Sequence, residues 1–213
     1  TNLDTSEMRV WDIVAEASRG TQEGKADRVC RILLAPAAVP GVFPAQEQEA
    51  FCRELLTGMG FSFVRGRADR STHPFTTMIG EDDVRLTLRF QPDNPLSAIF
   101  AALHEGGHAL YDQGFPATLH DTLLAEAPST GLHEAQARLW ENHVGRSAAF
   151  WSHHLPRLQS RFPAALAALD VAQFQRAVNV VQPTLIRAEA DEVTYNLHIL
   201  MRYELETALL SGD

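Results

Sequence analysis

The chain has 213 residues, 45% of them hydrophobic, which is long enough to bury a core as one domain. Its formal net charge of -9 argues against a surface that binds nucleic-acid phosphates or an anionic membrane. The two cysteines lack the spacing of a zinc knuckle and fit a reducing compartment, so any metal should be held by histidines and carboxylates. No basic region followed by an apolar run opens the sequence, and no apolar stretch could span a bilayer, so we expect a cytoplasmic protein.

The N-terminal part predicts helices and then a loop. Apolar residues between positions 6 and 34 suit two helical pieces, and prolines at 36, 40 and 44 break regular structure over 35–45. Residues 47–59 predict a helix that ends at Gly58 or Gly60. We expect a single domain over 1–213, in which 1–43 forms N-terminal helices and a loop and 44–213 forms the core.

Residues 61–90 follow the period of two that is typical of strands. The alternating apolar positions are Phe61, Phe63, Val84, Leu86, Leu88 and Phe90. The turn residues at 80–83 lie between 75–79 and 84–90, so the pattern predicts a small antiparallel sheet in which a hairpin follows a short strand. The edge of a hairpin beside a metal-binding helix can hold an extended peptide by main-chain hydrogen bonds.

The segment 103–111, with the sequence LHEGGHALY, could hold a divalent metal. It lies in a predicted helix that starts at an Asp-Asn-Pro cap and ends near position 113. Four residues make about 400° of helical rotation, so His104 and His108 lie on nearly the same face and can reach one ion. Glu105 is rotated by about 100° from His104, which suits a general base beside a metal-bound water. An ordinary amphipathic helix that matches the pattern by chance is the alternative.

Two adjacent glycines, Gly106 and Gly107, lie in the middle of this predicted helix. Each costs about 1 kcal/mol of helix stability relative to alanine. We therefore expect another backbone or a substrate to approach this face closely, and a tight helix crossing is an equally good explanation.

Four further helical segments are predicted after position 129. They are residues 132–144, ended by Gly145, a looser run through 150–158 that ends near Pro163, residues 171–181, and a long helix over 184–210 that follows Pro183. The predicted core face of the long helix consists of Leu185, Leu197, Leu200, Met201 and Leu205.

A catalytic zinc usually has three protein ligands and leaves one position open to water. The metzincin pattern is excluded because it needs a histidine at position 114, which is glycine here. The remaining candidates for a third ligand are His120, Asp121, Glu126, His133, Glu134 and Glu141. We favour Glu134, because the first turn of a new helix can point a carboxylate across an interhelical groove. An ion pair with Arg138, four residues on, explains the same position equally well.

The long C-terminal helix carries a polar stripe opposite its apolar face, formed by Arg187, Asp191, Thr194 or Tyr195, His198 and Arg202. Such a stripe is often a solvated surface, with an Arg187–Asp191 ion pair worth roughly a few tenths of a kcal/mol. An arginine oriented by a neighbouring aspartate is also suited to form two parallel hydrogen bonds with a substrate carboxylate. Arg85, which follows Asp83 in the hairpin, is a second candidate of this kind.

Five motifs, in the same order, resemble the carboxypeptidase Taq family of metallocarboxypeptidases over about 44–210. They are His73-Pro74-Phe75, Asp83-Val84-Arg85-Leu86-Thr87, HEGGHALYDQG, HEAQARLWENHVGRS and IRAEADEVTYNLHI. The resemblance implies a mainly α, gluzincin-like fold with a small antiparallel hairpin or sheet near the active site. It also implies a metal-dependent carboxypeptidase that acts on peptides with a free C-terminus, and a homodimer.

The resemblance further implies roles for individual residues. His104, His108 and Glu134 would ligate one divalent metal, Zn²⁺ first and Co²⁺ as an alternative, and Glu105 would be the base. The resemblance points to Arg85 or Arg187 as the residue that binds the terminal carboxylate of the substrate. His73 and Tyr195 are weaker candidates for substrate contact.

The chain also departs from the family pattern. Family members are around twice as long, with a helical region before the matched part and a Gly-x-x-Gln-Asp-x-His-Trp motif after it, and that motif is absent from these 213 residues. We expect a fragment, a short relative, or a chain whose cleft is completed by a second polypeptide. Two alternatives to a carboxypeptidase stay open. One is a metallo-oligopeptidase with the same site, and the other is a catalytically weak or silent metal-binding scaffold.

Overall fold

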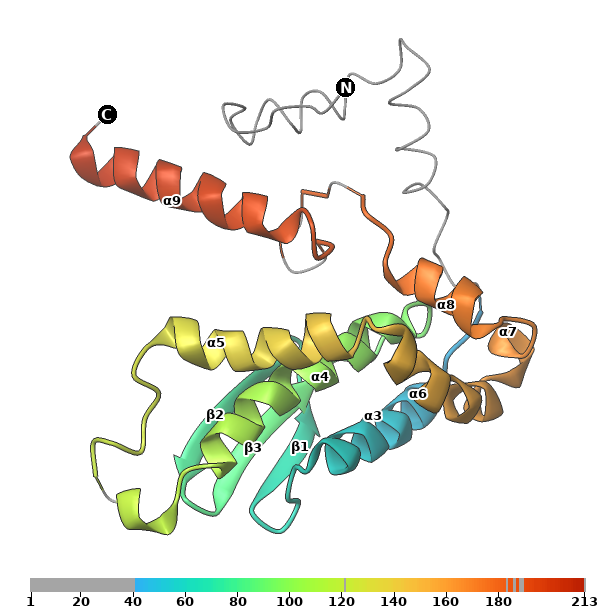
Figure 1. Cartoon of the computed structure of the whole chain (residues 1–213), viewed down its shortest axis with the longest axis horizontal. Helices are drawn as coiled ribbons and strands as arrows, with labels where there is room; N and C mark the ends of the chain where they lie inside the picture. Colours follow the sequence, from blue (N-terminus) through green and yellow to red (C-terminus); the bar gives the residue numbers. More distant parts are fainter. Residues whose placement is uncertain (1–40, 121, 183, 186, 188–189, 213) are drawn as a thin grey trace. The chain divides into compact units, whose positions relative to one another are not determined.

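The computed structural model describes residues 41–212 of the chain, apart from positions 121, 183, 186, 188 and 189 (Figure 1). The helices predicted at 6–34 and most of the loop predicted at 35–45 lie outside the described residues. The chain divides into two compact units, one of residues 38–178 and one of residues 1–37 and 179–213. The segment with the two histidines belongs to the first unit and the C-terminal helix belongs to the second.

The first unit combines helices with a small sheet, which confirms the mainly α fold that the sequence predicts. Its elements are α3 (Ala45–Met59), β1 (Gly66–Arg70), β2 (Phe75–Gly80), β3 (Asp83–Leu88), α4 (Pro95–Gln113), the 3-10 turn η1 (Ala117–Leu119), α5 (Thr130–Arg138), the π-helical segment η2 (Leu139–Val144), α6 (Ala148–Arg161), α7 (Pro163–Leu166) and α8 (Val171–Val178). Helix α3 ends at Gly60, one of the two predicted positions, whose φ of 105° lies in the left-handed region that glycine tolerates.

The three-stranded sheet has the order β1-β3-β2 and is mixed rather than purely antiparallel. β2 and β3 form the predicted antiparallel hairpin, whereas β1 runs parallel to β3. The strand predicted around Phe61 and Phe63 is wrong, because Phe61 N donates to Leu56 O as the chain leaves α3. The two rings pack edge to face with centroids 4.9 Å apart. Their alternation therefore reflects a turn that buries an aromatic side chain, and the first strand is β1 instead.

Helix α4 is the central element of the first unit. It begins as predicted at Pro95, where Asn94 Oδ1 accepts a hydrogen bond from Ser97 N at 3.2 Å. It contacts α3, α5, η2 and the strands β2 and β3 (Figure 1). Val84 and Leu86 of β3 are fully buried in the same apolar core as the inward face of α4. The sheet therefore fixes α4 from one side and the helices fix it from the others.

Gly106 and Gly107 mark close packing on two sides of α4. A Cβ atom at Gly107 would lie 2.6 Å from Ala137 Cα and 2.9 Å from Gln136 O of α5. At Gly106 a Cβ atom would lie 2.7 Å from Leu56 Cδ2 of α3. A tight helix crossing thus explains both glycines, and at Gly107 it is the backbone of the other helix that comes close.

The helix predicted over 132–144 changes type along its length. Ser129 Oγ caps α5 by accepting from Leu132 N at 3.1 Å. The helix then widens into the π-helical segment η2, which ends where Gly145 N donates to Trp140 O at 2.8 Å. Single π-helical turns occur frequently at functional sites, and apolar periodicity alone does not distinguish them from α-helix.

The helices predicted near 150–158 and over 171–181 correspond to α6 and α8, of which α8 ends at Val178. Trp151 of α6 and Phe174 of α8 are buried and their ring centroids are 4.5 Å apart. This aromatic contact packs the two helices against each other.

In the described part of the second unit, helix α9 (Tyr195–Ser211) begins well after the predicted start at position 184. Asp191 accepts from Val193 N and Thr194 N, each at 2.9 Å, and so forms a turn directly before the helix. The predicted core face is not buried among the described residues, where no residue of α9 is buried and Leu200 and Leu205 are exposed. Periodicity identified an apolar face but not whether anything covers it. Within the described residues, no helix is both long and apolar enough to cross a bilayer.

Candidate metal centre

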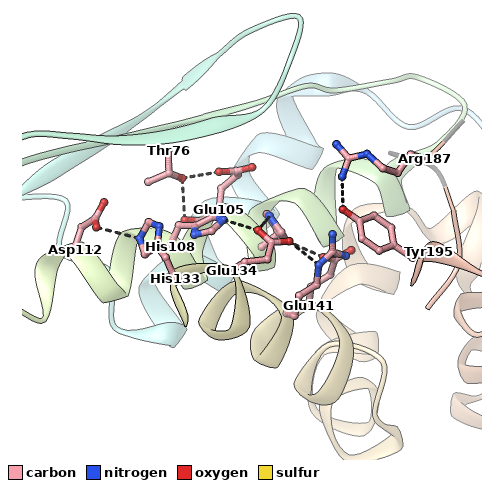
Figure 2. A network of polar contacts seen from close by, with 11 residues as sticks. Thr76, Glu105, His108, Asp112, His133, Glu134, Glu141, Arg187 and Tyr195 are labelled. Atoms are coloured by element: carbon pink, nitrogen blue, oxygen red, sulfur yellow. Dashed lines mark hydrogen bonds and ion pairs between the residues drawn. The ribbon is translucent and has the colours of Figure 1, made fainter. Parts of the chain in front are cut away.

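His104 and His108 of α4 converge with Glu134 of α5 in the first unit. Figure 2 shows His108 and Glu134 among their polar neighbours. The rings of His104 and His108 have centroids 4.9 Å apart. Glu134 Oε2 lies 3.7 Å from His104 Nε2 and 3.4 Å from His108 Nε2, and one donor atom of each residue lies within 4.8 Å of the others. Ligands about 2.1 Å from a tetrahedral ion are about 3.4 Å from one another. The three side chains therefore fit one divalent metal.

Gly107 is the reason that α5 can bring Glu134 so close to the histidines. The α5 backbone at Ala137 occupies the space that a side chain on Gly107 would need. Glu134 lies almost one helical turn before Ala137 and reaches across this crossing. The predicted interhelical position of Glu134 thus depends on a glycine in the neighbouring helix.

The second ring nitrogen of His104 is held by Glu141 of η2, with Nδ1 and Oε2 2.8 Å apart. Burial acts to lower the pKa of His104, but the hydrogen bond with Glu141 and the charges of Glu141 and Glu134 outweigh it, so the pKa is raised. A histidine that donates from Nδ1 to a carboxylate presents Nε2 in a fixed orientation, as metal-binding histidines do.

Glu134 is ionised around neutral pH. Its contact with His108 is the largest influence, and His104 and Arg138 act in the same direction against burial, so its pKa is lowered to about 2. Arg138 Nε donates to Glu134 Oε1 at 2.9 Å. The Glu134–Arg138 ion pair, the alternative explanation for Glu134 in the sequence, therefore coexists with the contact of Glu134 with the histidines.

Glu105 lies on α4 but contacts the hairpin (Figure 2). It is only 7% exposed, and its Oε2 accepts a hydrogen bond from Thr76 Oγ1 of β2 at 2.6 Å. The backbone oxygen of Glu105 lies 3.0 Å from the same hydroxyl. The carboxylate thus contacts strand β2 and lies beside the histidines rather than among the three clustered side chains.

Thr76 is not among the site residues that the sequence predicts. Its only sequence signal is its register in the hairpin, where it pairs with Leu86. Leu86 is buried on the sheet face that packs on α4, and directly opposite residues of an antiparallel pair share a face. A hydroxyl at this position is therefore directed at α4.

His133, another candidate ligand, is engaged beside the cluster. Its ring packs on that of His108 with centroids 4.4 Å apart, and its Nε2 lies 3.1 Å from Asp112 Oδ1. Burial raises the pKa of Asp112, although His133 acts to lower it. The buried His108 Nδ1 has no hydrogen-bond partner within the described part of the chain.

The other candidates for the third ligand lie elsewhere. Glu141 is on the Nδ1 side of His104, away from the Nε2 atoms that face Glu134. His120 Nδ1 pairs with Glu81 at 2.7 Å, and Glu126 is exposed. Asp121 lies outside the described residues.

Arg85, a candidate for reading the substrate carboxylate, lies on the sheet face opposite to α4. It alternates along β3 with Val84 and Leu86, which are buried toward α4. Its guanidinium forms a two-point ion pair with Asp83 at 2.8 and 2.6 Å. The structure therefore does not bring Arg85 into the cluster, and the side chain of His73 is exposed.

Arg187 and Tyr195 contact each other within the second unit, where Arg187 Nη1 donates to the Tyr195 hydroxyl at 2.5 Å. Asp191 instead accepts from Gln182 N at 3.0 Å and from Thr194 Oγ1 at 2.7 Å. The predicted Arg187–Asp191 ion pair is not among the contacts of the described residues. The Arg187 guanidinium is exposed and bonded to a neutral hydroxyl.

Comparison with known proteins identifies a family and several relatives. The family model for carboxypeptidase Taq (M32) metallopeptidase matches residues 28–213. Thermostable carboxypeptidase 1 of Thermus thermophilus is 49% identical over 171 residues, which are 80% of this chain and 33% of that protein. Carboxypeptidase 1 of Bacillus subtilis is 39% identical over 171 residues, which are 80% of this chain and 34% of that protein. The chain thus spans about a third of the length of these curated relatives.

Solved structures show the same similarity in the fold. The M32 carboxypeptidase from Deinococcus radiodurans R1 has a TM-score of 0.83 and 40% identity, covering 97% of this chain and 42% of that one. The Pyrococcus furiosus carboxypeptidase has a TM-score of 0.79 and 33% identity, covering 95% of this chain and 42% of that one. In sequence and in fold, this chain is therefore similar to a part of longer proteins.

Proposed function

We propose, because this chain belongs to the carboxypeptidase Taq (M32) family of metallopeptidases, that it carries the catalytic metal centre of a carboxypeptidase. The family is the one that the five sequence motifs resemble. The observation that carries the proposal is the convergence of His104, His108 and Glu134 at distances that fit one divalent ion. Since the curated relatives are named carboxypeptidases, the reaction we propose is removal of the C-terminal residue of a peptide.

His104, His108 and Glu134 would hold the metal through Nε2, Nε2 and Oε2. We favour Zn²⁺, and Co²⁺ suits the same donor set. When bound, such an ion polarises a carbonyl group and lowers the pKa of water to about 7. A divalent ion bound by two neutral imidazoles and one carboxylate keeps a net positive charge. The bound ion would therefore still attract an oxyanion.

Glu105 would take a proton from the attacking water and pass it to the leaving amine. The hydrogen bond from Thr76 engages Oε2, which leaves Oε1 to receive the proton. A positioned base of this kind contributes about 100- to 10,000-fold to the rate. The burial of Glu105 supports this role, because a carboxylate shielded from bulk water is held in one place.

The terminal carboxylate of the peptide requires a cationic partner, and Arg187 is our first candidate. Its guanidinium is exposed and its contact with Tyr195 is to a neutral hydroxyl, so it can form a bidentate pair with a carboxylate. Arg85 is the second candidate, and it would have to exchange Asp83 for the substrate. Tyr195 and the exposed His73 are further proposed contacts.

A matched pair of peptides tests the proposal. The purified chain with Zn²⁺ should release single residues from a peptide with a free C-terminal carboxylate and leave the C-terminally amidated peptide intact. Elemental analysis of the same preparation should give one metal per chain. Equal cleavage of both peptides would contradict a carboxypeptidase, and cleavage at internal bonds would identify a metallo-oligopeptidase instead.

A metal-binding unit without turnover of its own is the second candidate. It is favoured by the extent of the match, which covers 33% of the Thermus relative, so that the cleft of that protein can draw on residues outside the match. One bound metal per chain without hydrolysis of either peptide would support it.

The homodimer that the resemblance suggests is a separate proposal, and light scattering of the purified chain would test it.

A further inference from the structure

We propose that Arg138 is a positioning residue that holds two neighbouring carboxylates in place. It would orient Glu134 toward the metal and keep Glu141 on His104. The inference rests on the proposed metal centre and concerns a residue outside its ligand set. Arg138 is the last residue of α5, and its side chain is 23% exposed. Its guanidinium lies between the two carboxylates and bonds to both.

Arg138 holds the outer oxygen of Glu134. Its Nε donates to Oε1 at 2.9 Å, whereas Oε2 of the same carboxylate faces the Nε2 atoms of His104 and His108. Rotation about the terminal bond of a glutamate exchanges its two oxygens, and the bond from Arg138 opposes this rotation. One oxygen is therefore presented to the histidines before any ion binds.

The same guanidinium also holds Glu141. Its Nη1 donates to Glu141 Oε2 at 3.0 Å, and this oxygen also lies 2.8 Å from His104 Nδ1. Without Arg138, two carboxylates of like charge would lie beside one imidazole, and Glu141 would be free to leave Nδ1. Arg138 thus offsets negative charge next to the site and keeps Glu141 from competing with Glu134 for the metal.

The planar fork of arginine suits this task. Its N–H donors point in fixed directions, so that bonds to two separate carboxylates define one geometry, whereas a lysine ammonium is a point charge on a flexible stem. An ordinary ion pair at the same helical spacing exists in this chain between Arg202 and Glu206, whose side chains are 62% and 63% exposed. Arg138 differs in its burial, in its second carboxylate, and in the contact of that carboxylate with His104.

Metal affinity separates a positioning role from a purely structural one. The apparent Kd for Zn²⁺ would be measured on the full chain by competition with a chromophoric chelator, for the wild type, Arg138→Met and Arg138→Lys. We expect Zn²⁺ binding to weaken about 10- to 100-fold in both variants, as is typical when a residue that supports a metal ligand is removed. The visible spectrum of the Co²⁺-loaded chain should also change in Arg138→Met, because its bands report the number and geometry of the ligands.

Two further variants sharpen the test. Arg202→Met removes a helical arginine from an i,i+4 pair and should leave both the Zn²⁺ affinity and the Co²⁺ spectrum unchanged. Glu141→Gln, combined with Arg138→Met, tests the competition between carboxylates. The loss of affinity in the double variant should be smaller than the product of the two single losses, since a neutral side chain at position 141 competes less.

Glu134→Ala separates failure of this inference from failure of the proposed metal centre. If Glu134→Ala binds Zn²⁺ as tightly as the wild type, the metal centre itself is wrong. If Glu134→Ala loses affinity while both Arg138 variants keep the wild-type Kd and Co²⁺ spectrum, the positioning role of Arg138 is overturned and the centre stands. Thermal unfolding of each metal-free variant shows whether it folds. If Arg138→Met does not fold, the Kd and Co²⁺ spectrum of Arg138→Lys, which keeps the charge, test the positioning role instead.

Discussion

The Thr76 hydroxyl donates to Glu105 Oε2 at 2.6 Å, which ties the edge strand of the sheet to the proposed general base. The hydroxyl is also 3.0 Å from the backbone oxygen of Glu105, so the strand is held against the helix at the residue that carries the carboxylate. Burial of Glu105 keeps bulk water from replacing this contact. The hairpin therefore orients the proposed base as well as covering the helix.

Replacing Thr76 by valine should lower kcat and leave KM nearly unchanged. A hydrogen bond to a charged group is worth about 1.5–3 kcal/mol, which corresponds to about a 10- to 100-fold loss of rate. Thr76→Ser keeps the hydroxyl and should restore most of the rate. Steady-state kinetics on the peptide with a free carboxylate would measure both variants, with Zn²⁺ content as the control. Wild-type kcat in the valine variant would show that the contact does not matter for turnover.

Replacing Glu105 by glutamine should remove turnover without removing the metal. Glutamine has nearly the same shape but cannot take a proton, so kcat should fall by about 100- to 10,000-fold. Because Glu105 is not one of the proposed ligands, elemental analysis should still give the wild-type metal content. His108→Ala is the matched variant that should lose the metal as well. Activity close to wild type in Glu105→Gln would exclude this residue as the base.

The sequence predicted the parts of the site that depend on one helix. His104 and His108 are related by helical rotation alone, and the Asn94 cap fixed the start of α4 correctly. Glu134 was a choice among several residues, because its approach depends on how two helices cross. The glycine pair indicated such a crossing but not which helix would come close.

Contacts between distant segments explain what the sequence could not predict. Thr76 and Glu105 are 29 positions apart, and His104 and Glu141 are 37 positions apart. The parallel pairing of β1 with β3 depends on the path of the chain after α3, and no local pattern distinguishes it from an antiparallel pairing. Arg138 and Glu141 are only three residues apart, so helical spacing could have predicted their ion pair, but not the contact of Glu141 with His104.

Replacing Gly107 by alanine should destabilise the fold. The new methyl group would meet the α5 backbone at 2.6 Å, which cannot move without separating two helices, so we expect a loss of about 1–3 kcal/mol despite the gain in helix propensity. Gly106→Ala should cost less, because its neighbours include the flexible end of Met59. Urea unfolding of the metal-free chain would measure both.

Gly58→Ala is the matched control for these glycines. Gly58 lies near the end of α3, and a methyl group added there would have no neighbouring atom within 4 Å, so alanine should stabilise the chain by about 0.5–1 kcal/mol. The Zn²⁺ affinity should fall in Gly107→Ala, since α5 carries Glu134, and stay unchanged in Gly58→Ala. Equal stability changes at positions 107 and 58 would contradict the tight crossing of α4 and α5.

His154 of α6 should make the stability of the fold depend on pH. Burial, followed by the charges of His153 and Arg157, lowers its pKa from 6.5 to about 4. Between these values the unfolded chain binds the proton more readily than the folded chain does. The contribution of His154 is therefore fully present above pH 6.5 and is lost as the pH falls toward 4.

His154→Gln should flatten this part of the pH profile, because glutamine does not titrate. Thermal unfolding would be followed from pH 4 to 7 in the presence of a chelator, so that loss of metal does not add to the slope. His153→Gln is the matched control on the exposed side of the helix, and it should keep most of the slope because burial is the largest cause of the shift. Curves for His154→Gln and the wild type that run parallel over this range would contradict the assignment to His154.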